Sequence, residues 1–359
     1  MSADLETARL LFDGQRLAQA RQFRGLLKGE LAGQVGVTPA AIGQFEAGVA
    51  RPSAWTLGKL AIALGVPVAF FSQGRRLFAL REDDAHFRSL RSTSKRDRAQ
   101  ARSQVERLAE VVAAIEDRVR LPEVDLPDIP AGTPPEDAAR IVRTAWQLGD
   151  GPIADMVRLL ERRGVIVARL PAATDEVDAF SCRVGMRPFV ILSSNKGAAD
   201  RSRFDSAHEL GHLLLHPDAK PGDPRVEREA HRFAAELLTP ATSIVKELPR
   251  RVDWRAYAEL KLRWRVAISM LLLRARDLGV ISDAAYRRAM MEMSRRSWRR
   301  NEPASLGEPE EPELLGRAMA LLASKRQFTL DDLSAELALG PEGLAAYQGL
   351  LDPIEPLAV

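Results

Sequence analysis

The segment from Phe204 to Pro217, FDSAHELGHLLLHP, holds three of the five histidines of the chain. Its apolar residues recur at helical spacing, so we expect one amphipathic helix. His208 and His212 are four residues apart, which on a helix places them about 40° apart around the axis and about 6 Å apart along it. Two imidazoles in this arrangement can bind one metal ion. The segment therefore predicts a helix that faces a metal site.

Glu209 completes an HExxH pattern with these two histidines. In this pattern the imidazoles bind zinc (Zn2+), and the glutamate takes a proton from the zinc-bound water that attacks a peptide carbonyl. His216 lies one turn further along the same face, about 12 Å from His208 by helical rise, which is too far for all three histidines to bind one ion. A hydrogen bond to a ligand-bearing carboxylate, contact with substrate and a structural role at the helix end all stay open for His216.

A zinc site with an open position for water needs a third protein ligand. Asp218 stands where a metzincin would have its last histidine, and the glycine of that class is absent, so the metzincin pattern fails. The next amphipathic helix, VEREAHRFAAELLTP, offers Glu227, Glu229 and His231. The residues alone leave the choice among these three open.

The stretches RFDSAHELGHLLLH, EREAHRFAAELLTP and LKLRWRVAISMLLLRARDLGVIS follow one another in this order. Over about residues 150–300 the chain thus resembles the ImmA/IrrE metallopeptidase family. The resemblance implies a zincin-like α+β domain with Glu229 as the third ligand, although His231 stands where the family often has asparagine. It also implies a peptidase that cuts a helix-turn-helix repressor and so releases genes after stress or phage-related signals.

Residues 12–71 alternate short apolar-periodic segments with glycines and prolines, which predicts a bundle of about five short helices. Gly36 ends one helix, Thr38 caps the next with Pro39 at its first position, and Gly48 ends that helix. Two helices joined by a tight turn form a helix-turn-helix motif. Through ELAGQVGVTPAAIGQFEAGVARPS and LGKLAIALGV, the segment resembles the phage-repressor and xenobiotic-response-element (XRE) helix-turn-helix family. Such domains bind double-stranded DNA as dimers, so we expect a homodimer on a pseudo-palindromic site.

The expected recognition helix is poor in groups that read bases. Pro39, Ala40 and Gly43 leave Gln44 as the one obvious donor and acceptor pair, while Ala40 can touch a thymine methyl. The expected phosphate contacts come from three basic residues, Arg21, Lys28 and Arg51. Residues 13–76 carry eight Lys and Arg against three Asp and Glu, which favours DNA binding over a helical bundle without DNA affinity.

A basic stretch, a proline-rich stretch and two β-branched runs lie between these two regions. The stretch RSLRSTSKRDRAQARSQVER begins a long basic helix, for which a solvated face is favoured over a second nucleic-acid surface. The proline-rich LPEVDLPDIPAGTPP predicts a semi-rigid linker. Two amphipathic helices and the β-branched runs VIVARL and FVILSSN then precede the histidine helix, which predicts an α+β domain with a small sheet.

The C-terminal region changes in charge. From Pro303 onward there are three Lys and Arg against ten Asp and Glu. The stretch EPASLGEPEEPE predicts an acidic linker, and a Thr329-capped helix with a turn at Gly340 predicts a small helical module. Its acidity disfavours DNA, so a protein-contact or dimerisation module is expected. For RRSWRR at residues 295–300, a solvated helix end is favoured over nucleic-acid binding.

Cys182 is the single cysteine, so an internal disulfide framework is excluded. With no signal-peptide pattern and no apolar run of membrane-spanning length, we expect a cytoplasmic protein that contacts no membrane. Two interpretations of Cys182 stay open. It is either a small buried hydrophobe or a thiolate that occupies the fourth zinc position and keeps a peptidase silent.

Together these features predict a mainly α, multidomain chain. The leading hypothesis is a DNA-binding transcription regulator with a zinc-dependent endopeptidase domain that cleaves a repressor, either itself or a partner. The alternative is a DNA-binding sensor whose HExxH domain binds metal or ligand without cleaving protein. Glu209 favours the enzyme, because a sensor needs no base. We expect a five-helix helix-turn-helix domain at residues 1–74 and a helical connector with the proline-rich linker at residues 75–133. The peptidase domain is expected at residues 134–302, and the acidic linker with its helical module at residues 303–359.

Overall fold

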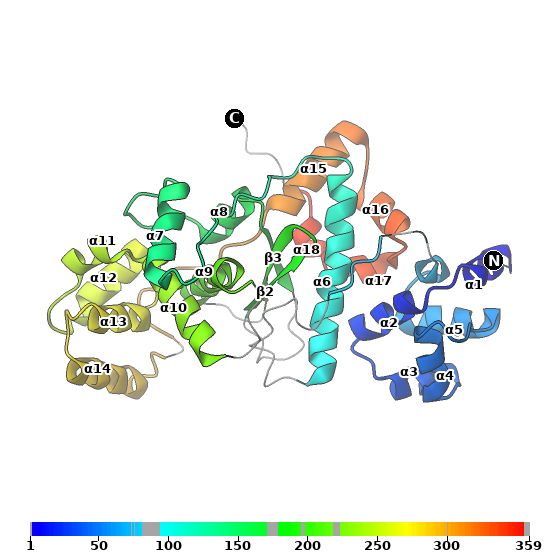
Figure 1. Cartoon of the computed structure of the whole chain (residues 1–359), viewed down its shortest axis with the longest axis horizontal. Helices are drawn as coiled ribbons and strands as arrows, with labels where there is room; N and C mark the ends of the chain where they lie inside the picture. Colours follow the sequence, from blue (N-terminus) through cyan, green and yellow to red (C-terminus); the bar gives the residue numbers. More distant parts are fainter. Residues whose placement is uncertain are drawn as a thin grey trace.

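The computed structural model is mainly helical with one small sheet, as the sequence predicts. Figure 1 shows an elongated chain, with the N-terminal helices at one end and helices α11 (Ala241–Glu247) to α14 (Asp283–Arg295) at the other. None of the helices described is long and apolar enough to cross a membrane. The structure describes residues 2–72, 74, 76–80, 94–170, 179–194, 198–217, 223–299 and 301–354.

The N-terminal bundle follows the predicted caps. Gly36, with φ of 74°, ends α3, a left-handed conformation that glycine adopts readily. The Thr38 hydroxyl accepts a hydrogen bond from the Ala41 N–H at 3.2 Å and so caps α4. The bundle consists of α1 (Ser2–Leu10), α2 (Gly14–Phe23), α3 (Lys28–Val35), α4 (Pro39–Glu46), α5 (Ala54–Leu64) and the 3-10 helix η1 (Val68–Phe71).

The long helix α6 (Lys95–Glu116) holds this bundle through a buried polar interface. Arg16 of α2 donates from Nη1 to both carboxylate oxygens of Glu110 at 2.6 and 2.7 Å. Gln19 donates to the same carboxylate, and Ser103 of α6 donates to the Gln19 carbonyl oxygen. Residues 88–93 of the basic stretch lie outside the described residues. Of the rest, Lys95 and Arg96 are exposed as expected, whereas Arg107 and most of α6 beyond it are buried.

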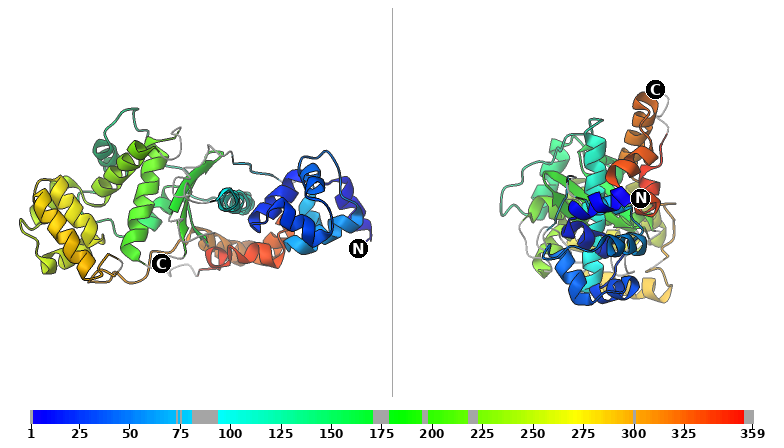
Figure 2. Two further views of the ribbon diagram at one scale, coloured as in Figure 1. Left: turned by 90° about the horizontal axis from the view of Figure 1, so that it is seen from below. Right: turned by 90° about the vertical axis from the view of Figure 1, so that its right-hand side faces the viewer.

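The sheet has strand order β1-β3-β2, with β1 (Ile166–Leu170) parallel and β2 (Ala179–Val184) antiparallel to β3 (Arg187–Ser193). One face shares a core with α6, and the other packs on α9 (Ala199–Leu215). Figure 2 shows α6 end-on between the sheet and the N-terminal helices. The sheet thus separates the N-terminal bundle from the histidine helix.

A second core surrounds α9. Helix α10 (Pro224–Leu238) packs against both α9 and α7 (Pro135–Ala145), and the remaining helices of this core extend to the far end of the molecule. These are α8 (Met156–Arg162), α11, α12 (Trp254–Trp264), α13 (Ile268–Asp277) and α14.

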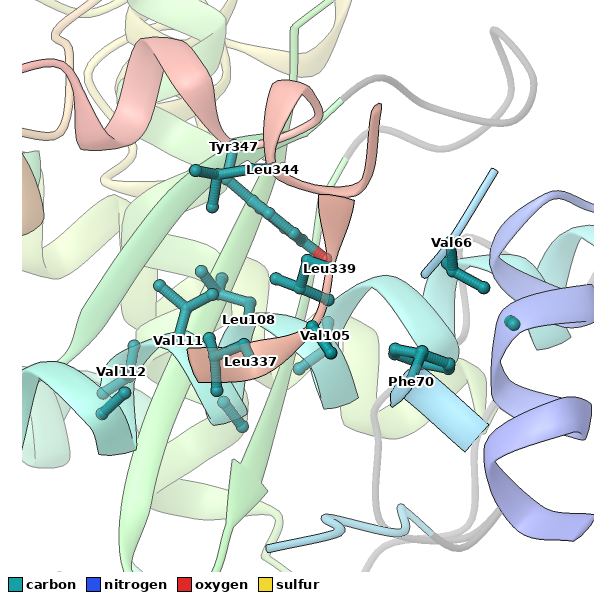
Figure 3. Packing of buried hydrophobic residues seen from close by; sticks show 14 of the residues in the cluster. Val66, Phe70, Val105, Leu108, Val111, Val112, Leu337, Leu339, Leu344 and Tyr347 are labelled. Atoms are coloured by element: carbon teal, nitrogen blue, oxygen red, sulfur yellow. The ribbon is translucent and has the colours of Figure 1, made fainter. Parts of the chain in front are cut away.

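The C-terminal helices cover α6. Figure 3 shows Leu337 and Leu339 close to Val105 and Leu108 of α6, in one hydrophobic cluster with Leu344. The Tyr347 hydroxyl donates to the Gln104 carbonyl oxygen at 2.7 Å, and Thr329 forms the predicted cap with Asp332. The module therefore contacts its own chain. It comprises α15 (Leu314–Arg326), α16 (Leu330–Leu337), α17 (Gly340–Ala345) and α18 (Gln348–Leu351).

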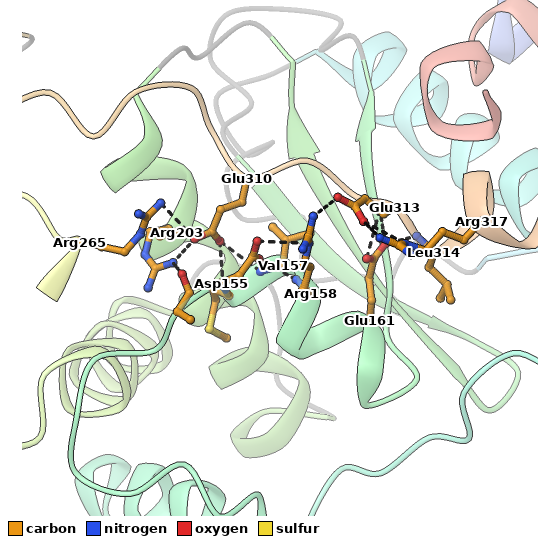
Figure 4. A network of polar contacts seen from close by, with 12 residues as sticks. Asp155, Val157, Arg158, Glu161, Arg203, Arg265, Glu310, Glu313, Leu314 and Arg317 are labelled. Atoms are coloured by element: carbon orange, nitrogen blue, oxygen red, sulfur yellow. Dashed lines mark hydrogen bonds and ion pairs between the residues drawn. The ribbon is translucent and has the colours of Figure 1, made fainter. Parts of the chain in front are cut away.

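The acidic segment before α15, expected to be a linker, is instead docked on the second core (Figure 4). Glu310 is buried; its Oε2 accepts from the N–H groups of Met156 and Val157 at the start of α8, at 2.8 and 3.2 Å. Its other oxygen pairs with buried Arg203 of α9. In return, Glu161 of α8 accepts from the first N–H groups of α15. Carboxylates complement helix N-termini, so each segment caps the other.

Candidate metal centre

Helix α9 aims two imidazoles at one point. Ala207, Leu210 and Leu213 face the second core, which fixes the rotation of the helix and leaves His208 and His212 on an adjoining face. The Nε2 atoms of these histidines lie 3.0 Å apart, and their rings meet edge to face. The predicted pairing of the histidines at one point is thus present in the geometry.

Glu227 of α10 completes the group. Its Oε2 lies 3.2 Å from Nε2 of His208, and its Oε1 lies 3.4 Å from Nε2 of His212. A tetrahedral zinc ion with bonds of about 2.0–2.1 Å separates neighbouring ligand atoms by about 3.3–3.4 Å. Two imidazole nitrogens and one carboxylate oxygen also match the donor set of catalytic zinc sites. These three residues therefore fit a metal ion of the zinc class.

The close contact of α10 with α9 depends on Gly211. A Cβ at this position would lie 3.0 Å from Cδ1 of Phe233 and 3.4 Å from the Cα of Ala230. Glycine in a helix interior costs about 1 kcal/mol relative to alanine, so its presence here has a packing reason. That reason is the approach of α10, which brings the Glu227 carboxylate to the histidines.

Glu209 follows His208 on α9 and is buried. Oε2 of its carboxyl accepts a hydrogen bond from the Ser181 hydroxyl of β2 at 2.7 Å. Burial raises the pKa of Glu209 to about 8; the Ser181 hydrogen bond opposes this rise and the nearby Asp205 carboxylate adds to it. A carboxyl with a pKa near neutrality suits proton transfer. Ser181 was not singled out from the sequence, although its place on the strand before the histidine helix was a usable signal.

Glu229, which the resemblance implies as a ligand, lies elsewhere. Its Oε2 is 2.9 Å from Nε2 of His216, and Nδ1 of His216 is 3.3 Å from Nδ1 of His212. Residues two apart on a helix point about 200° apart, so Glu227 and Glu229 flank the apolar stripe of α10 on opposite sides. Only one can reach the two Nε2 atoms, and that one is Glu227. Burial lowers the pKa of His216, while the Glu229 carboxylate raises it.

His231 and Cys182 do not join the three ligand atoms. The exposed ring of His231 stacks on Phe204 and lies 4.6 Å, centroid to centroid, from His208 at the rim of the site. Cys182 follows Ser181 on β2, and successive strand residues face opposite sides. Its side chain is buried in the core that the sheet shares with α6, away from the histidines. The proposed thiolate latch is therefore wrong, and the interpretation as a buried hydrophobe fits.

The expected DNA contacts are spread unevenly over the N-terminal bundle. Pro39, Ala40 and Gln44 are exposed on α4, and Arg51 is exposed beyond it. Lys28 is half-exposed, with Nζ 3.2 Å from Glu46. Arg21 differs, because it is buried and pairs with Glu46 at 2.5 Å while donating to the Leu26 carbonyl. Arg21 is thus committed inside the bundle, which argues against a phosphate contact.

Comparison with known families agrees with this architecture. Residues 17–71 match a helix-turn-helix family, and residues 160–276 match the IrrE N-terminal-like domain of the M78 peptidases. No curated protein matches the chain. The second match covers α9 and α10, and with them both histidines, Glu209 and Glu227. The chain thus combines a region similar to XRE-type helix-turn-helix domains with a region similar to the IrrE/ImmA-like domain of the M78 family.

Proposed function

We propose that this chain is a DNA-binding transcription regulator whose IrrE-like domain is a zinc-dependent endopeptidase. The observation that carries the proposal is the convergence of His208, His212 and Glu227, together with the buried carboxyl of Glu209 on the helix that carries both histidines. His208, His212 and Glu227 would hold the zinc ion. When bound, zinc supplies a Lewis acid and an activated water.

Glu209 is the proton carrier of the proposed reaction. Ser181 holds its Oε2 through a hydrogen bond, so Oε1 is the oxygen that takes a proton from the attacking water. The same oxygen then delivers that proton to the amine nitrogen of the leaving peptide. Both functions require a carboxyl that exchanges its proton near neutral pH, which agrees with its raised pKa.

The proposed substrate is a protein segment in extended form. Among the strands described, β2 lies at an edge of the sheet and carries Ser181, the hydrogen-bond donor to Glu209. An extended peptide adds to such an edge through main-chain hydrogen bonds. We propose that the segment belongs to a helix-turn-helix repressor, and that its cleavage releases genes after stress or phage-related signals.

The arrangement of the chain favours cleavage of another molecule. The N-terminal bundle docks on α6, and the sheet lies between α6 and the histidine helix. The recognition helix of the same chain is therefore on the far side of the sheet from Glu209. We propose that the substrate is a second copy or a partner repressor. A homodimer on a pseudo-palindromic duplex in the cytoplasm is part of the same proposal.

A cleavage assay with mass spectrometry tests the proposal. Zinc-loaded wild type and Glu209→Gln are each incubated with candidate helix-turn-helix repressors and with tagged copies of the chain itself. We expect new peptide ends with wild type alone, while both proteins bind zinc and DNA. Intact substrates in every reaction, together with DNA affinity that changes on zinc loading, would support the non-proteolytic sensor instead.

A further inference from the structure

A line of side chains leads from the candidate metal centre to the surface of α10. Nδ1 of His212 lies 3.3 Å from Nδ1 of His216, and Nε2 of His216 lies 2.9 Å from Oε2 of Glu229. The other oxygen of Glu229 is 3.5 Å from the exposed Arg225 guanidinium, one turn earlier on α10. The line thus begins at a candidate ligand on α9 and ends on the helix that supplies Glu227.

One assignment of protons satisfies every group in this line. Nε2 of His212 faces His208 and Glu227, so it is the nitrogen that must be free of a proton to bind a metal. The proton of a neutral imidazole is then on Nδ1, which donates to Nδ1 of His216. His216 consequently carries its own proton on Nε2 and donates it to the Glu229 carboxylate.

Burial makes these contacts hard to replace with water. His212 is 2% exposed and His216 is 6% exposed, whereas the Glu229 side chain is 27% exposed. The two imidazoles therefore depend on each other for orientation, and the carboxylate at the end of the line is the one charged acceptor on it.

We propose that His216 and Glu229 act as positioning residues, which fix the tautomer and ring orientation of His212 and increase its basicity toward the metal. The inference rests on the proposed metal site, but not on proteolysis. Metal-binding imidazoles commonly donate their second N–H to such a partner, and loss of the partner typically reduces metal affinity 10–100-fold. Here the partner is a second histidine, which is held in turn by a carboxylate.

A purely structural role is the competing explanation, because the His216–Glu229 contact also ties the end of α9 to α10. The chain offers a matched control for this. Arg232 of α10 forms a bidentate ion pair with Glu136 of α7. Its Nε and Nη2 atoms each lie 2.7 Å from one carboxylate oxygen. Glu136→Ala removes a tie between α10 and its neighbour without touching the histidines.

The test is zinc affinity of the full chain at fixed pH, measured by competition with a chelator. We expect His216→Ala and Glu229→Ala to weaken zinc binding about 10–100-fold. Glu229→Gln keeps an acceptor oxygen without the charge, so it should lose less than Glu229→Ala. Glu136→Ala should bind zinc like wild type. The absorption bands of bound Co2+ should shift in His216→Ala and stay unchanged in Glu136→Ala.

Each other outcome has a definite meaning. Wild-type zinc affinity in both His216→Ala and Glu229→Ala would overturn the positioning role while leaving the metal site intact. Loss of zinc in Glu229→Ala as complete as in Glu227→Ala would make Glu229 a ligand itself. A wild-type chain that binds no zinc would overturn both the positioning role and the proposed function.

Discussion

Single residues decide what the candidate site does, and their spacing predicts only part of it. His208, Glu209 and His212 are predictable because one helix fixes their relative directions. The sequence does not predict that Glu227 rather than Glu229 lies next to the two histidines. Both glutamates flank the apolar stripe of α10, and the side from which α10 meets α9 decides between them. Sequence alone also cannot tell which face of β2 meets α9, and hence that Ser181 rather than Cys182 faces Glu209.

Ser181→Ala should shift the pH profile of cleavage. The Ser181 hydrogen bond lowers the pKa of Glu209, so its removal raises that pKa further. The base must be ionised to accept a proton, and the rising limb of activity should therefore move to higher pH. Zinc affinity should not change. Ser206→Ala, which removes a buried hydroxyl bonded to the Ser202 carbonyl, is the control and should keep the wild-type profile. An unshifted limb in Ser181→Ala would contradict the contact with the base.

Arg51→Ala and Arg21→Ala should have different effects on DNA binding and on stability, although both remove one positive charge from the bundle. Exposed Arg51→Ala should weaken binding to all duplexes alike and reduce the slope of affinity against salt by about one ion. Arg21→Ala leaves buried Glu46 without its main partner, so it should lower the stability of the bundle. Salt-dependent DNA titrations and thermal unfolding separate the two effects. An equal loss of salt slope in Arg21→Ala would restore it as a phosphate contact.

At the scale of elements, local signals predicted helix ends better than helix surroundings. Thr38, Gly36 and Thr329 mark helix ends as predicted, because capping is satisfied within a few residues. The surroundings of α6 depend on partners nearly 100 residues away, such as Arg16 for Glu110, so the expected solvated face holds only for the start of the helix. Packing between residues so far apart in the chain cannot be predicted from the local sequence.

Gly211→Val should weaken metal binding without removing a ligand. A β-branched side chain here would meet Phe233 and Ala230, so α10 must move away and carry Glu227 with it. We expect lower zinc affinity at nearly unchanged helix content, measured by chelator competition and circular dichroism. Gly349→Ala, on a helix where an added Cβ meets nothing within 4 Å, is the control and should bind zinc normally. Wild-type affinity in Gly211→Val would show that the close approach is not required.

At the scale of the whole molecule, the acidic segment binds the parts together. Its proline-rich, charged composition predicts a linker, because composition does not show that α8 and Arg203 bind the carboxylate of Glu310. The C-terminal module, held through this segment and through α6, joins both halves of the chain. The relative placement of the DNA-binding and peptidase-like parts is thus set by contacts that no single segment encodes.

Glu161→Gln should reduce the pH dependence of stability. Burial raises the pKa of Glu161 to about 7, against the lowering effect of its backbone hydrogen bonds from α15. The folded pKa of Glu161 lies above the unfolded value of 4.5. Its protonation therefore contributes fully to the free energy of unfolding below about pH 4.5, and this contribution is lost as the pH rises to about 7. One such proton gives a slope of at most about 1.4 kcal/mol per pH unit. Urea unfolding between these pH values should show a smaller fall in Glu161→Gln than in wild type.

Glu310→Ala should be the most damaging change in the acidic segment. It leaves the first N–H groups of α8 without their cap and leaves buried Arg203 without its carboxylate. Loss of one partner of a buried ion pair costs about 3–5 kcal/mol. Urea unfolding followed by circular dichroism should show this loss, while Glu308→Ala, at an exposed position two residues earlier, should unfold like wild type. Because Arg203 is on α9, zinc affinity should fall with stability in Glu310→Ala. Wild-type stability in this variant would return the segment to the status of a linker.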